Sequence, residues 1–257
     1  MEKFEYDKSL DFDKLPQEYK GIKFYPLLIS EDKMFDKVMQ TIGIPKSYIK
    51  TEPTIMKMSY LKFLCFALRK RDDIIDMLSY ITKNDNIKIE VSLRKGADET
   101  NLRYEDMNIS VYIGDVCFNE SDFDIIRDII LRQNYYSTAY IEEYDPELEE
   151  LLLIKQKALC EGSSLEDKKF ALCSLLRRLP EEIKDLSYYQ FYKLYYSSTM
   201  LVNTQIYQGW ISSGFISLEK GKTFTTYLDP MPDRGGRYDS IKMSKEDFFD
   251  KVGMKPS

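Results

Sequence analysis

Through most of the chain, apolar residues recur every three or four positions between short polar breaks. This spacing places apolar side chains along one face of a helix. It predicts helices at about residues 30–43, 59–68, 72–81, 119–134, 145–162, 164–179 and 187–214. Local start signals agree, including Pro146 at a first helical position and the capping pair Ser187 and Gln190. We therefore expect a mostly helical protein.

Strand patterns are confined to the first half of the chain. Residues 87–93 alternate apolar and polar side chains, which is typical of a half-buried strand. Residues 108–113 and 116–118 flank Gly114-Asp115, a two-residue connection compatible with a tight hairpin because glycine readily takes positive φ. Residues 21–28 predict a short edge strand that we expect to join the same sheet.

These elements predict an α+β fold, predominantly helical, in three parts. We expect residues 1–118 to form a small α+β domain, with a small, mostly antiparallel sheet and helices, and residues 119–214 to form a helical domain. Glycines and prolines break the periodicity after that point. Residues 215–257 are therefore predicted to be an extended C-terminal arm with a short helix at 245–252.

The composition narrows the range of partners. Of 257 residues, 43% are hydrophobic and 31% are charged, which is typical of an ordered globular protein. The net charge of −6 argues against nucleic acid as a partner, because binding phosphates needs a clustered positive field. No apolar run approaches the ~18 residues of a membrane span, and the first residues lack the apolar core of a signal peptide. We expect a cytoplasmic protein with no membrane partner, and four free, buried cysteines.

The sequence contains few of the residues and motifs that are typical of enzymes. The chain has 20 tyrosines and no histidine, the side chain that most often acts as a general base or metal ligand near neutral pH. The sequence contains no nucleophile elbow, glycine-rich phosphate loop, paired-cysteine zinc site or calcium loop. We expect no catalytic residue, no cofactor and no metal, and a protein that is not an enzyme.

Two charged stretches are candidates for binding. The acidic run at 142–150 straddles a predicted helix start, where carboxylates favour the helix dipole and stay in water, so we expect a solvated face. Arg234-Gly235-Gly236-Arg237, followed by Tyr238, could grip a phosphate or carboxylate, although it matches no specific motif. We expect this stretch to become ordered on a partner, with an anion site or an ordinary loop as alternatives.

The helix predicted at 187–214 has two sets of large side chains. The set expected to face the core contains Phe191, Leu194, Tyr195, Ser198, Leu201, Val202, Ile206 and Trp210. The set that lies off this stripe contains Tyr189, Tyr192, Tyr196, Met200 and Tyr207. Because Tyr and Met are enriched at protein interfaces, the second set is either additional core or a partner-binding surface.

Several strings, taken together, resemble a known group of proteins. They are Gly21 to Pro26, Ile55 to Leu64, Phe123, Ile126, Ile129 and Ile130 with Gln133-Asn134, Tyr144 to Glu147, and Leu186 to Tyr192. As a set they resemble uncharacterised proteins of Gram-positive bacteriophages and prophages, which are similar in turn to tail-assembly chaperones and baseplate-hub assembly proteins of contractile-tailed phages. The resemblance covers about residues 20–215 and rests on apolar patterns. It implies no catalytic residue, and a role in binding a tail component or in the baseplate.

We therefore expect a non-enzymatic phage tail or baseplate protein, structural or acting in assembly, that works through protein–protein interfaces. Its expected partners are other phage tail or baseplate proteins, with a homo-oligomer as a further option, in the host bacterial cytoplasm or in the virion tail. The candidate contact residues are Tyr189, Tyr192, Tyr196, Met200, Tyr207, Arg234, Arg237 and Tyr238. The alternative is an enzyme, or a regulator that binds an anion or nucleotide through the Arg234-Gly235-Gly236-Arg237 loop.

Overall fold

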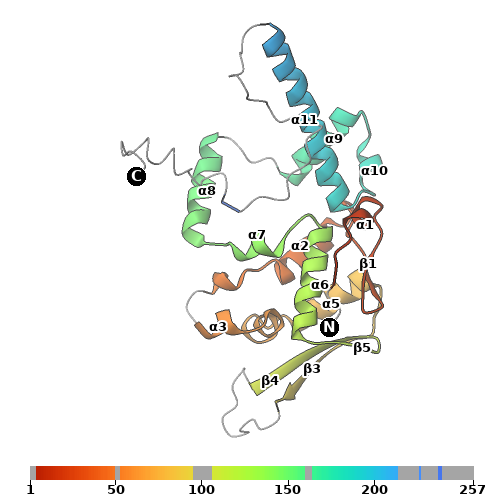
Figure 1. The fold of residues 1–257 in the computed structure, drawn as a ribbon, viewed down its shortest axis with the longest axis vertical. Coiled ribbons are helices and arrows are strands. Elements are labelled where there is room, and N and C mark those ends of the chain that lie inside the picture. The colour runs from red at the N-terminus through yellow and green to blue at the C-terminus, as the bar shows by residue number, and fades with distance from the viewer. Residues whose placement is uncertain are drawn as a thin grey trace.

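The computed structural model describes residues 4–49, 53–94, 106–159 and 164–213, together with Thr226, Arg237 and Tyr238. The chain has the predicted α+β, predominantly helical fold (Figure 1). In chain order the elements are α1 (Lys8–Phe12), β1 (Gln17–Tyr19), β2 (Ile22–Phe24), α2 (Asp32–Ile42), the 3-10 turn η1 (Lys46–Tyr48), α3 (Pro53–Lys57), α4 (Tyr60–Lys62), the π-helical turn η2 (Phe63–Ala67), α5 (Arg71–Thr82), β3 (Ile87–Leu93), β4 (Met107–Ile113), β5 (Val116–Phe118), α6 (Glu120–Gln133), α7 (Thr138–Glu142), α8 (Pro146–Leu159), α9 (Leu165–Leu176), α10 (Pro180–Ile183) and α11 (Tyr188–Ser212).

Each predicted helix up to residue 214 has a counterpart in the structure. The short helices α1, α3, α7 and α10 were not predicted, because four or five residues are too few to establish a helical repeat. The predicted terminal helix at 245–252, and the predicted arm apart from three residues, lie outside the described part of the chain.

The hairpin of β1 and β2 differs from the predicted sheet arrangement. Residues 21–28 were expected to join the larger sheet, but β2 pairs antiparallel with β1 in a separate two-stranded sheet. Lys20 and Gly21 connect the two strands, and both have positive φ, which is the geometry that closes a tight two-residue hairpin. Because only two residues separate β1 from β2, closing the loop between them costs little conformational entropy.

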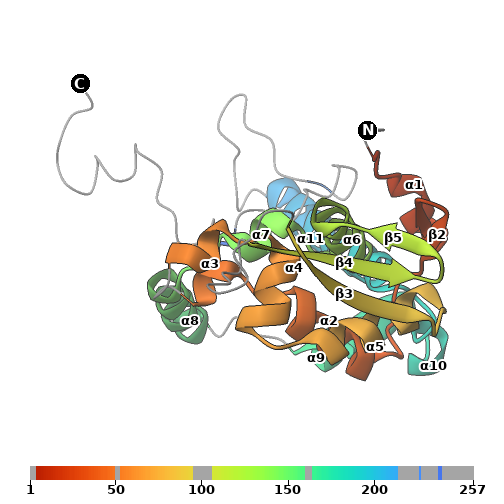
Figure 2. The same cartoon turned by 90° about the horizontal axis from the view of Figure 1, so that it is seen from below.

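The larger sheet is antiparallel, as predicted, with the order β3-β4-β5. Ile87 pairs with Ile113, and Gly114 makes the predicted turn with a φ of 60°. Alternate residues of the central strand, Ile109, Val111 and Ile113, are buried. Helices α5 and α6 pack against the sheet (Figure 2). One face of the sheet therefore contributes to the core.

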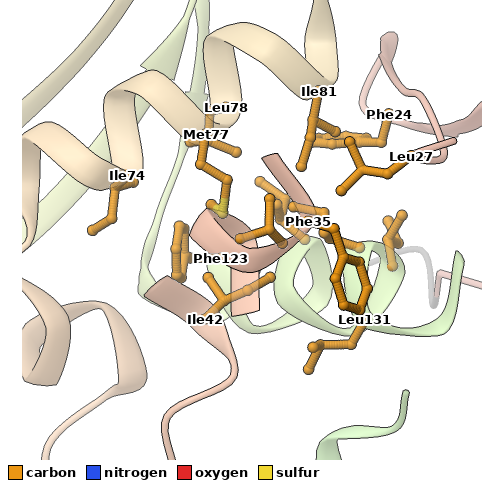
Figure 3. Close-up of a cluster of buried hydrophobic side chains, with 14 of the residues drawn as sticks. Phe24, Leu27, Phe35, Ile42, Ile74, Met77, Leu78, Ile81, Phe123 and Leu131 are labelled. Carbon is orange, nitrogen blue, oxygen red and sulfur yellow. The ribbon is translucent and has the colours of Figure 1, made fainter. Parts of the chain in front are cut away.

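The core is built around α2, α5 and α6 (Figure 3). Its buried side chains from these helices include Phe35, Val38 and Ile42 of α2, Ile74, Met77, Leu78 and Ile81 of α5, and Phe123, Ile126, Ile130 and Leu131 of α6. Leu172 of α9 and Phe191 of α11 belong to the same cluster. The buried core is therefore continuous across the predicted domain boundary at residues 118 and 119, and the division into separate folding units stays a prediction.

A buried charge lies where α2, α4, α6 and α7 meet. The Arg127 guanidinium, on α6, donates to the carbonyl of Ile42 at 3.0 Å and to the Glu142 carboxylate at 2.7 Å. It also stacks on the Tyr60 ring, with its central carbon 3.4 Å from the ring centroid. The Tyr60 hydroxyl is within hydrogen-bond distance of the carbonyls of Ile42 and Ile44, at 2.8 and 2.9 Å. Four elements are thereby joined through polar groups inside the core.

The cysteines agree only partly with expectation. Cys65 and Cys173 are free and buried, whereas Cys117 is free but exposed, because its side chain points away from the buried Phe118 that follows it on β5. Cys160 lies outside the described residues. Among the helices that the structure describes, none is long and apolar enough to cross a bilayer.

Two phenylalanines in contrasting positions test this core. Phe123 is fully buried, whereas Phe12 at the end of α1 is 74% exposed. Truncating Phe123 to alanine should lower the free energy of unfolding by about 3–5 kcal/mol, because it leaves a cavity. The same change at Phe12 should cost less than about 0.5 kcal/mol. Urea unfolding followed by circular dichroism measures both, and equal costs would contradict this packing.

Candidate functional site

Helix α11 is fixed to the body of the protein at its N-terminal end. Ser187 and Gln190 form the predicted capping box, and Ser187 also joins an isolated antiparallel bridge to the segment before α2. Tyr188 and Phe191 are fully buried. The Tyr188 ring stacks on Phe35 of α2, with the ring centroids 3.8 Å apart. These contacts set the direction in which the helix leaves the core.

The C-terminal half of α11 is largely exposed. Within residues 201–213 only Val202 is half-buried and only Thr204 is buried, and the other side chains are exposed. Ile206 and Trp210, which were expected to face the core, are exposed, Trp210 to 45%. The helix has 25 residues and so spans about 37 Å. Figure 1 shows its C-terminal part extending beyond α9 and α10.

The predicted core stripe is therefore wrong for most of this helix. Of its eight members, Phe191 is buried, Tyr195, Ser198 and Val202 are half-buried, and Leu194, Leu201, Ile206 and Trp210 are exposed. The physical reason is that helical periodicity reveals an apolar face but not what covers it. An interface helix and a core helix share this pattern.

The second set of α11 side chains does not form one surface. Tyr192 is half-buried and stacks on Tyr135, with the ring centroids 4.9 Å apart, so it packs beside the core. Tyr189, Tyr196 and Met200 are half-buried. Tyr207 is exposed and meets Trp210 edge-on at 5.6 Å. Of the five predicted contact residues on this helix, Tyr207 alone is exposed.

Four exposed side chains form one face at the end of the helix. Ile206, Tyr207, Trp210 and Ile211 are spaced i, i+1, i+4 and i+5, which places them on the same side. We call this set the α11 tip. Leu201, also exposed, lies on another side of the helix, because nine residues separate it from Trp210 and correspond to about 180° of rotation at 3.6 residues per turn.

Sequence reasoning missed a signal for this tip. No Asp, Glu, Lys or Arg occurs between Leu194 and Ser213, although 31% of the chain is charged. An exposed helix normally carries charged residues on its solvent face. Depletion of charge is instead typical of the centre of a protein interface.

Two residues of the predicted arm contact the junction of α7 and α8. The Arg237 guanidinium donates two hydrogen bonds to the Glu149 carboxylate, at 2.8 Å from Nε and 3.0 Å from a terminal nitrogen. The backbone N–H of Arg237 donates to Glu143 at 2.6 Å. The guanidinium also lies 5.4 Å from the ring centroid of Tyr140 and 5.0 Å from that of Tyr144. Arg234, the other predicted arginine, lies outside the described residues.

Tyr238 completes this contact and is only 2% exposed. Its hydroxyl accepts a hydrogen bond from the backbone N–H of Asp145 at 2.7 Å. The Asp145 carbonyl, at 2.9 Å, and the Glu149 carboxylate, at 3.2 Å, are acceptors for the hydroxyl proton. We call Tyr140, Glu143, Tyr144, Asp145 and Glu149 the α7–α8 socket.

The expectation of a fully solvated acidic face is wrong for part of the run. Glu142 forms an ion pair with the buried Arg127, and Glu149 forms one with Arg237. Hydrogen bonds from Arg237 lower the pKa of Glu149 below its ordinary value. Burial lowers the pKa of Arg237, but the hydrogen bonds and the electrostatic attraction to Glu149, with smaller contributions from Tyr140 and Tyr238, together outweigh it, so the net shift is upward. Each partner is therefore held in its charged form.

A cavity of about 680 Å³ lies beside α2, α9 and the start of α11. Lys169 donates to one oxygen of Asp32 at 2.7 Å, and the Tyr188 hydroxyl donates to the other at 2.8 Å. Burial raises the pKa of Tyr188, and the hydrogen bond to Asp32 raises it further. The phenol thus stays protonated as a donor. These three groups satisfy one another, which is the arrangement of a structural ion pair. Among the described residues, no group of three or more His, Cys, Asp or Glu side chains could hold a metal ion.

No protein-family model, curated protein or solved structure matches this chain. A functional assignment therefore rests on the α11 tip, the α7–α8 socket and the residue patterns of the sequence.

The contact between Arg237 and Glu149 should depend on pH. Because the pKa of folded Glu149 lies below its ordinary value of 4.5, the Arg237 contact should be complete above pH 4.5 and lost as the pH falls through the lower pKa. Hydrogen-exchange protection of the Asp145 amide should fall over this range. At pH 7, Glu149→Gln should reduce that protection by about tenfold or more, because it removes a charge-assisted pair. The amide of Val111 in β4 is the control, and unchanged protection of Asp145 would contradict the contact.

Proposed function

We propose that this chain is a non-enzymatic structural or assembly protein of a phage tail or baseplate, and that it binds another tail protein through the α11 tip. The observation that supports an interface is the exposed face of Ile206, Tyr207, Trp210 and Ile211 on a helix anchored at its other end. The assignment to a tail comes from the resemblance of residues 20–215. The chain would act in the host cytoplasm during assembly or as part of the finished tail.

The composition of the tip indicates the chemistry of the partner. Tryptophan and tyrosine are enriched among the residues that dominate binding energy, and they occupy the centres of interfaces. The tip has no charged neighbour along α11 from residue 194 onward. The partner should therefore present an apolar groove or helix face. A charged partner surface would be stripped of water on contact with the tip and would find no opposite charge there to compensate.

Substitutions on α11 test this proposal with a matched control. Ile206→Ser with Trp210→Ser removes the tip, whereas Leu201→Ser changes an equally exposed apolar residue on another side of the helix. Each variant is mixed with purified phage tail and baseplate proteins, one protein at a time. The tip variant should keep its circular dichroism spectrum and bind its partner at least about tenfold more weakly, because truncating an interface tryptophan commonly costs 2 kcal/mol or more.

The control decides how a loss of binding is interpreted. Leu201→Ser should change affinity by no more than about twofold, as expected for a residue outside the interface. Equal losses in both variants would contradict the tip as the contact. Failure of every tail and baseplate protein to bind the unmodified chain, together with its absence from purified virions, would contradict the function itself.

The alternative of an enzyme or anion-binding regulator has a separate test. The guanidinium of Arg237, one of its two arginines, is held by the Glu149 carboxylate, which opposes the binding of an anion there. We therefore expect no thermal stabilisation by nucleotides, sugar phosphates or divalent metals. A true ligand at 100 times its dissociation constant would stabilise the fold by about 2.7 kcal/mol. A shift that disappears in Arg237→Ala would favour the alternative.

A further inference from the structure

The contact between Arg237-Tyr238 and the α7–α8 socket has the features of peptide recognition. Two consecutive residues supply a backbone N–H, a guanidinium and a phenol, and each of these groups has a named partner. The partners combine a bidentate carboxylate with aromatic rings near the cation. Arginine is recognised in this way where a planar, doubly hydrogen-bonded pair is needed. The phenol adds selectivity, because its hydroxyl meets both a backbone donor and a backbone acceptor at Asp145.

The socket is held in place by parts of the fold other than its occupant. Ser137 accepts a hydrogen bond from the Tyr140 amide at 3.1 Å and so fixes the start of α7. The Ser47 hydroxyl donates to the carbonyl of Tyr144 at 2.8 Å. The Asp145 carboxylate accepts from the Glu147 amide at 2.9 Å at the start of α8. A site organised in this way loses little entropy when a ligand enters.

The charge of the socket defines its ligand. The socket carries three carboxylates within seven sequence positions, those of Glu143, Asp145 and Glu149, and an aromatic ring at Tyr144. Without Arg237 this surface would be negatively charged. Such a surface attracts a cation that can also stack on an aromatic ring. The Arg237-Tyr238 pair fits these requirements, and every copy of the chain carries it.

We propose that the α7–α8 socket is a binding site for an arginine–tyrosine peptide segment, and that it accepts this segment from a second copy of the chain as well as from its own. The ligand is the stretch of chain that carries Arg237 and Tyr238. Exchange between copies would replace each contact with an identical one. The proposal does not depend on the tail assignment, and it uses residues remote in sequence from the α11 tip.

A labelled peptide of residues 232–243 tests whether the socket works in trans. The host is the full chain with Arg237→Ala and Tyr238→Ala, which leaves the socket intact but removes its own ligand. Fluorescence anisotropy should show saturable binding. Adding Glu149→Gln to the host, or Arg237→Ala to the peptide, should weaken binding by about tenfold or more, since each removes the bidentate pair. The altered peptide keeps Arg234, so it controls for general attraction between charges.

Mixing two variants tests exchange between copies. Full-length Glu149→Gln has a damaged socket and an intact Arg237-Tyr238 segment. The chain with Arg237→Ala and Tyr238→Ala has an intact socket and lacks the segment's side chains. Only the mixture can form the Arg237–Glu149 pair. Sedimentation should show association of the mixture at least about tenfold tighter than that of either variant alone.

Several outcomes would overturn the proposal. They are the absence of peptide binding, peptide binding that Glu149→Gln leaves unchanged, and a mixture that associates no better than its components. If the double-alanine chain is not folded by circular dichroism, Arg237→Ala alone is the host, and the same criteria apply. Failure of these tests would leave binding at the α11 tip unaffected, so the two proposals fail separately.

Discussion

The buried guanidinium of Arg127 determines how several elements meet. It bonds to the carbonyl of Ile42 at the last turn of α2, where the helix dipole favours a cation, and it stacks on Tyr60 of α4. Its ion pair with Glu142 fixes the last residue of α7. The α7–α8 socket continues at Glu143, so its position follows from this pair. Removing Glu142 would leave the buried guanidinium without its ion-pair partner, which destabilises the fold, although by less than in a fully buried pair because the Glu142 side chain is 34% exposed.

Features that depend on neighbours in sequence were predictable. The capping box at Ser187, Pro146 at the first position of α8 and the hairpin turn at Gly114 are all present, because a cap or turn is determined by a few adjacent residues. The strand β1 was missed because Lys20-Gly21 is a weaker hairpin signal than Asn-Gly or Asp-Gly. Positive φ at a lysine becomes evident only when the strands pair.

Features that depend on distant residues were not predictable from pattern. The acidic run and the arginine stretch were both visible, but 88 positions separate Glu149 from Arg237, and no local rule pairs them. The face of α11 posed a different problem. Apolar periodicity was detected correctly, but it could not distinguish a covered face from an exposed one. The absence of charged residues from Leu194 to Ser213 was the signal that distinguished the two cases, because a helix face that stays in contact with water normally carries charged residues.

The place of Trp210 has a consequence for spectroscopy. It is the single tryptophan of the chain, and it lies at the exposed end of α11, away from the anchored turn of Tyr188 and Phe191. Indole emission therefore reports the surroundings of the helix end and not the packing of the core. Denaturation followed by that emission would register little of the loss of the core, whereas a molecule that covers the helix end would shift the spectrum without any change in fold. The protein thus carries a built-in optical probe of its own exposed helix.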